Sequence, residues 1–164
     1  AKGFRLVGSS EGVKPKVILD DWWRIAKGSY ITALEFENIE FSHTSNNKYF
    51  MNADKSFTIE SVSFVNCDFI GLTRGFWRHQ QATSKHIMSF AVEGCRFDKC
   101  GWQTGSYGLM DLRSFNDPTA YDQVDKAVFR NCTFSRDNDG TTGFGWGNLF
   151  NAPYIDKPLS LIHI

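Results

Sequence analysis

A short pattern that recurs four times constrains the fold of this chain more than any other feature. Each copy runs apolar residue, variable residue, Asn or Gly, Ile or Cys, variable residue, Phe, at residues 36–41, 64–69, 92–97 and 129–134. The closing residues Phe41, Phe69, Phe97 and Phe134 are 28, 28 and 37 residues apart, so the last interval carries an insertion. Residues 4–8 read as a degenerate earlier copy. A fixed period of about 20 to 50 residues indicates a repeat architecture.

Each copy predicts two short strands joined by a bend. In the first copy, apolar residues alternate on both sides of Asn38, which is the pattern of a half-buried strand interrupted once. Asn and Gly tolerate positive φ, so the predicted bends are Asn38, Asn66, Gly94 and Asn131. A further apolar run follows each copy, at residues 49–52, 75–78, 109–112 and 149–151. Three strands per roughly 28 residues make one coil of a solenoid. An antiparallel β-sandwich is the alternative, but it gives no reason for the period.

These coils resemble the right-handed parallel β-helices of the pectin-lyase-like group, and most closely uncharacterised β-helix domains in secreted or surface proteins of polysaccharide-degrading bacteria. In that group an Asn occupies the tight bend between the second and third strands of a coil. The resemblance covers about residues 4–164 and implies an all-β, single-stranded parallel β-helix of about five coils. It does not imply one activity, because pectate lyases, pectin methylesterases, polygalacturonases and non-catalytic domains share the fold.

Length and charge limit the remaining possibilities. The chain has 164 residues, which predicts a single domain over residues 1–164. Its 18 Lys and Arg balance 18 Asp and Glu, which argues against binding nucleic acid by bulk electrostatics. No apolar run is long enough to cross a membrane. Residues 159–164 alternate like the first strand of another coil, so we expect a domain that is incomplete at its C-terminus.

The cysteines are expected to be structural. Cys67, Cys95 and Cys132 occupy the same repeat position, which predicts a column of buried, reduced thiols. We expect native labelling to reach at most Cys100. A disulfide between Cys67 and Cys95 is the alternative, although parallel neighbours rarely offer suitable geometry.

We expect no metal and no cofactor. The chain contains neither a C-x-x-C pair nor the motifs of zinc proteases, serine hydrolases or phosphate-binding loops. Residues 137–140 begin like a calcium loop but lack its closing Glu, so calcium is only a weak alternative.

The resemblance places a substrate groove along the first strand of each coil. Aligning those strands predicts a polar column of Asn52, Arg78, Asp111 and Asn151. The candidate catalytic residues are Arg78, Asp111 and Arg113, because a guanidinium can hold an acidic sugar while a carboxylate exchanges a proton. The competing interpretation is a surface ion pair of Arg78 and Asp111 that contributes little. Aromatic side chains beside the groove would stack on sugar rings. The expected substrate-binding set is Asn52, Arg74, Trp77, Arg78, His79, Trp102, Tyr107, Asp111, Trp146 and Asn151.

Three functions follow from these expectations. The first is a non-catalytic β-helix domain of a secreted or cell-surface bacterial protein that contacts polysaccharide, with acidic polysaccharide as one option. The second is a lyase or pectin esterase acting on a uronate-containing polymer, although the complete catalytic motifs of those families are absent. The third is a structural stalk or adhesin segment that needs no site.

Overall fold

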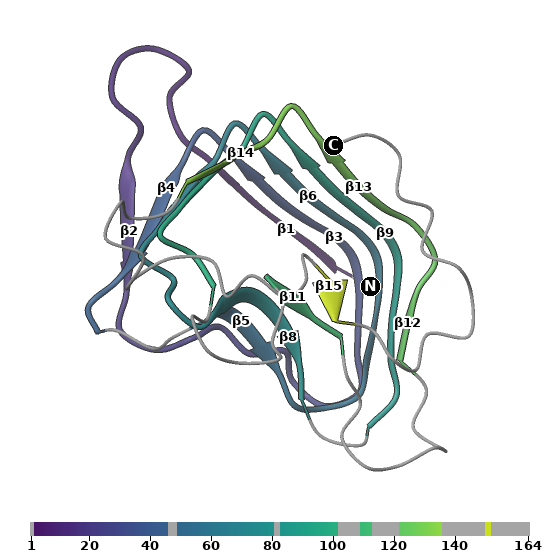
Figure 1. Cartoon of the computed structure of the whole chain (residues 1–164). Helices are drawn as coiled ribbons and strands as arrows, with labels where there is room; N and C mark the ends of the chain where they lie inside the picture. The colour runs from purple at the N-terminus through teal and green to yellow at the C-terminus, as the bar shows by residue number, and fades with distance from the viewer. Residues whose placement is uncertain are drawn as a thin grey trace.

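The computed structural model describes residues 2–45, 49–80, 83–101, 109–112, 122–135 and 150–151. These residues form strands and no helix, and therefore no helix that could cross a membrane. The strands belong to three sheets, here called A, B and C, in which every pair of neighbouring strands is parallel. Figure 1 shows the sheets as the walls of a solenoid whose coils lie on top of one another.

The strands of one sheet come from successive coils. Sheet A contains β1 (Lys2–Val7), β3 (Ser29–Glu37), β6 (Phe57–Val65), β9 (Lys85–Glu93), β12 (Asp122–Val124) and β13 (Ala127–Arg130). Sheet B contains β2 (Lys16–Leu19), β4 (Glu40–His43), β7 (Asp68–Ile70), β10 (Arg96–Asp98) and β14 (Thr133–Ser135). Sheet C contains β5 (Tyr49–Ala53), β8 (Gly75–His79), β11 (Met110–Asp111) and β15 (Phe150–Asn151).

The strand register confirms the 28-residue period. Phe36 pairs with Phe64, and Phe64 pairs with Val92, each 28 residues further along the chain. The same offset joins β4 to β7 and β7 to β10. The parallel solenoid predicted from the sequence is therefore correct, and the β-sandwich is excluded.

The number of complete coils is smaller than predicted. Within the described residues, three turns have a strand in each sheet, beginning at β5, β8 and β11, against the expected five. Among the described residues that precede β5, sheet C is represented only by an isolated bridge between Trp23 and Met51. The early repeat at residues 4–8 thus supplies a strand of sheet A without a full coil around it.

The predicted bends are also confirmed. Asn38, Asn66 and Asn131 have φ of 55°, 50° and 53°, and Gly94 has φ of 62°. The side-chain amide of Asn66 donates to the Asn38 side-chain oxygen at 2.7 Å. Gly94 has no side chain with which to continue this ladder. These residues turn the chain from sheet A into sheet B in each coil.

Aromatic rings fill the interior. On sheet B, Phe41, Phe69, Phe97 and Phe134 stack in one column, with adjacent centroids 5.5, 4.9 and 5.2 Å apart. The predicted phenylalanine column is therefore present, although Phe134 is only partly buried. Columns from sheets A and C meet it, so that Phe69 also contacts Phe64 and Phe76. The three walls share a single hydrophobic core.

Candidate functional site

The polar column expected on sheet C is aligned in the structure. Asn52 pairs with Arg78, Arg78 pairs with Asp111, and Asp111 pairs with Asn151. Arg78 Nε lies 3.5 Å from Asp111 Oδ2, and the Asn52 amide donates to Gln80 Oε1 at 3.0 Å. The sequence alignment of these strands thus identified residues that are spatial neighbours.

The column is buried rather than open to solvent. Asn52, Arg78 and Asp111 are 5%, 6% and 0% exposed, and every residue of β5 and β8 is buried. The interpretation of Arg78 and Asp111 as a surface ion pair is therefore wrong. Inside a protein, charges of this kind must be paired, because removing either partner leaves an uncompensated charge. A ligand could reach this pair only after a rearrangement that exposed it.

A tyrosine lies under the guanidinium groups at one end of the column. Arg78 and Arg74 place their guanidinium carbons 5.4 and 5.7 Å from the centre of the Tyr49 ring. Burial raises the pKa of Tyr49, and the Arg78 guanidinium opposes that rise. Tyr49 therefore remains a neutral phenol at physiological pH and acts as a cation–π platform for the two arginines.

Two of the predicted sugar-contacting residues are enclosed in the structure. Trp77 and His79 are both 0% exposed, and the indole Nε1 of Trp77 donates to His79 Nε2 at 3.0 Å. Trp77 packs against Phe90, and His79 lies against Phe57. Because side chains alternate between the two faces of β8, Trp77 and His79 lie on the opposite face from Arg78 and do not share a groove with it. Their rings are not available for stacking on a sugar.

The remaining predicted residues lie outside the described part of the chain or are placed by their strand alone. Arg113, Trp102, Tyr107 and Trp146 lie outside the described residues, as do residues 137–140 of the calcium alternative. Asn151 is placed by its strand alone. Across the described ranges, no group of three or more His, Cys, Asp or Glu side chains could hold a metal ion.

The cysteine column has an unexpected order of exposure. All four cysteines are free thiols, but Cys100 is 0% exposed and Cys132 is only partly buried. Burial raises the pKa of Cys100 to about 12. A hydrogen bond between the Cys67 and Cys95 thiols lowers the pKa of Cys67 and raises that of Cys95. Two expectations are therefore wrong: Cys132 is not fully buried, because it lies between the last described strands of sheets A and B, and Cys100 is not accessible, because it is enclosed in the core.

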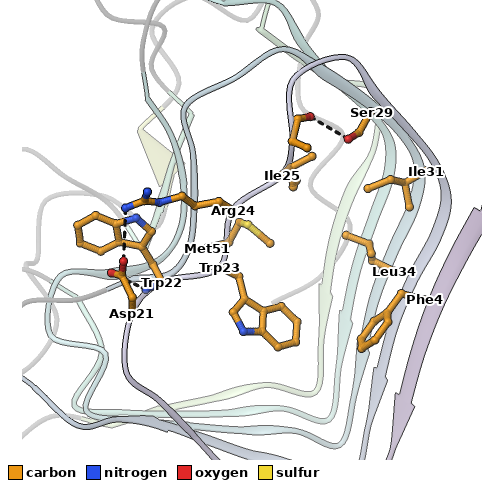
Figure 2. Close-up of a pocket in the computed structure, with 11 residues that line it drawn as sticks. Phe4, Asp21, Trp22, Trp23, Arg24, Ile25, Ser29, Ile31, Leu34 and Met51 are labelled. Atoms are coloured by element: carbon orange, nitrogen blue, oxygen red, sulfur yellow. Dashed lines mark hydrogen bonds and ion pairs between the residues drawn. The ribbon is translucent and has the colours of Figure 1, made fainter.

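An apolar hollow opens at the N-terminal end of the solenoid. Its volume is about 620 Å³, and it is lined by Phe4, Asp21, Trp22, Trp23, Arg24, Ile25, Ala26, Ser29, Ile31, Leu34 and Met51. Figure 2 shows Trp23, Phe4 and Leu34 around the hollow, with Arg24 beside Trp22. Trp23 packs on Phe36 and Phe50, with centroids 5.3 and 5.1 Å away. It therefore partly plugs this end of the aromatic core.

Sequence reasoning overlooked this hollow and a smaller one at the corner between sheets C and A. Trp22 and Trp23 belong to no repeat copy, so the repeat pattern gives no indication of their role. The smaller hollow is formed by Gly28, Ser56 and Ser84, among other residues, and measures about 280 Å³. The sequence does contain a sign of this hollow, because the three residues recur at the same 28-residue interval as the bends.

Comparison with known proteins identifies no relative. No protein-family model, no curated protein and no solved structure gives a significant match to the chain.

Proposed function

We propose that this chain is a non-catalytic β-solenoid domain that binds polysaccharide, in a secreted or cell-surface bacterial protein of the pectin-lyase-like kind. The family, location and ligand in this proposal come from the resemblance of the repeat.

Regular register is the observation that carries the proposal. β3, β6 and β9 pair residue for residue over most of their length, so one outward position recurs in every coil. Parallel strands are about 4.8 Å apart, so such a surface repeats its chemistry at that spacing along the solenoid. An extended polymer of similar repeat meets the same type of group at each step. A compact small molecule gains nothing from this repetition.

Burial of Asp111 favours binding over catalysis. A general acid or base must approach the proton that it transfers to within hydrogen-bonding distance. The Asp111 side chain is inaccessible and is already paired with Arg78. The alternative, a lyase or esterase of uronate polymers, is supported by the proximity of these two groups alone. It requires a rearrangement that exposes them.

The test is binding followed by product analysis. The purified chain would be applied to a panel of neutral and uronate-containing polysaccharides, and each polymer that binds would be incubated and examined for cleavage or demethylation. We expect binding without product. Product formation that disappears in Asp111→Asn would establish the enzymatic alternative. If the chain neither binds nor modifies any polymer, the proposal fails and a structural stalk explains the fold better.

A further inference from the structure

The corner hollow is a groove formed by one turn of the solenoid in three successive coils. Its lining consists of Gly28, Ser29, Tyr30, Ser56, Phe57, Thr58, Ser84, Lys85 and His86, three consecutive residues from each coil at 28-residue intervals. Backbone hydrogen bonds join the coils: Gly28 N–H donates to the Ser56 carbonyl at 2.8 Å, and Phe57 N–H donates to the Ser84 carbonyl at 3.2 Å. The groove therefore crosses the strands, along the solenoid axis, on a rigid backbone.

The groove offers hydroxyl groups that the protein itself does not use. The side-chain hydroxyls of Ser56, Thr58 and Ser84 form no hydrogen bond with any residue in the described parts of the chain. At the same corner, Gly28 has φ of 72°, and a Cβ built there would contact nothing within 4 Å. The first coil thus leaves space where the next two present serine. Each hydroxyl can both donate and accept a hydrogen bond.

The ionisable groups that line the groove already form hydrogen bonds within the protein. The Tyr30 hydroxyl donates to Glu60 Oε1 at 2.6 Å, and His86 Nε2 lies 3.0 Å from Asp125 Oδ2. The Lys85 ammonium is fully buried and donates to the Thr83 carbonyl at 2.8 Å. These contacts hold the side chains in place. The described lining contains no carboxylate, and its one ammonium is buried, so recognition here depends on hydrogen bonding more than on charge.

Tyr30 adds an apolar surface at one end. The residue is 49% exposed, while its hydroxyl is held by Glu60. An aromatic ring fixed in this way can stack on the apolar face of a pyranose. The groove consequently combines an aromatic wall with a row of hydroxyls spaced by the coils.

We propose that this groove binds an extended neutral glycan lying along the solenoid axis, with one sugar facing each coil. The sugar hydroxyls would pair with Ser56, Thr58 and Ser84, and a ring at the first coil would stack on Tyr30. A β-1,4-linked chain advances by nearly one coil spacing per sugar, so that each coil faces one ring. This inference rests on the proposed polysaccharide-binding function, and it places the contact at the corner of sheets C and A instead of on the buried column of sheet C.

The test uses cellohexaose, mannohexaose and xylohexaose as neutral probes and hexagalacturonate as the acidic probe, each titrated calorimetrically into the intact chain. The double variant Ser56→Ala/Thr58→Val removes two hydroxyls with little change in shape. We expect it to weaken binding of a neutral hexasaccharide by about tenfold or more, because each hydroxyl contributes a hydrogen bond. Tyr30→Ala should weaken binding as well, whereas Tyr30→Phe should retain most of it.

Ser63→Ala is the matched control, since Ser63 lies on the same strand as Thr58 and forms no side-chain hydrogen bond with a described residue. Ser63→Ala should leave the affinity for the neutral hexasaccharide within twofold of the wild-type value. Circular dichroism should show that every variant is folded. Unchanged affinity in the double variant would overturn the assignment of this groove as the binding site, while leaving the proposed polysaccharide binding intact. Binding of hexagalacturonate alone would overturn the neutral class. If wild type binds no glycan, this inference and the proposed function both fail.

Discussion

Phe69 provides the most direct test of the aromatic core. Its side chain is 0% exposed and lies midway along the sheet B column, 5.5 Å from Phe41 and 4.9 Å from Phe97 between ring centroids. The rings of Phe64 and Phe76 lie 5.5 and 4.5 Å away. Replacing a buried Phe with Ala costs about 3 to 5 kcal/mol, as the sum of lost transfer free energy and the cavity left behind.

Several close ring contacts place Phe69→Ala no lower than the middle of that range, at about 4 kcal/mol. With a urea m value of about 2 kcal/mol/M, the unfolding midpoint would fall by about 2 M. The assay is urea unfolding followed by tryptophan fluorescence and circular dichroism. Typical domains are stable by only about 5 to 15 kcal/mol, so this variant could be unfolded at the outset.

Phe69→Leu keeps the measurement possible in that case, because it refills most of the cavity and should recover more than half of the loss. Phe4→Ala is the control for removal of a ring as such. Phe4 is 47% exposed, so its loss should cost at most about 1.5 kcal/mol. Equal losses for Phe4→Ala and Phe69→Ala, or a loss below about 1 kcal/mol for the latter, would refute the reasoning.

Four further predictions concern the bends, the ion pair and the thiols. Gly94→Asn should stabilise the fold by about 0.5 to 1 kcal/mol in urea unfolding, because Asn accepts φ of 62° and extends the amide ladder; a loss equal to that of Gly94→Ala would contradict this. Arg78→Ala should destabilise the fold by about 3 to 5 kcal/mol in urea unfolding, since it removes the guanidinium that faces the buried Asp111 carboxylate; a change below 1 kcal/mol would mean that the pair is solvated in solution. Native thiol labelling should modify Cys132 first and leave Cys100 protected until unfolding, and mass spectrometry of labelled peptides would reveal the reverse order. Burial raises the pKa of Cys100 from 9.0 to about 12, so its stabilising contribution is complete below pH 9 and is lost as pH rises towards 12. Cys100→Ala should therefore flatten the alkaline decline in the free energy of unfolding. An unchanged slope of that decline would count against this prediction.

Much of this architecture can be read from the chain itself because a solenoid is a local structure repeated. The period of 28 residues determines which strands pair, the alternation of apolar residues determines which side faces inward, and Asn38 and Asn66 mark positions that need positive φ. Each of these properties depends on neighbouring residues or on the same position one coil away. The alignment of Arg78 with Asp111 could be predicted for the same reason.

Exposure was decided only by the tertiary structure. Strand alternation distinguishes two faces, but it cannot tell whether the outward face is covered, and on sheet C both faces proved to be buried. Arg78 and Asp111 therefore form a buried ion pair and not part of the open groove that the strand alignment predicted. The groove at Ser56 likewise depends on the shape of a turn stacked three times, which follows from how the coils pack and not from the type of any one residue.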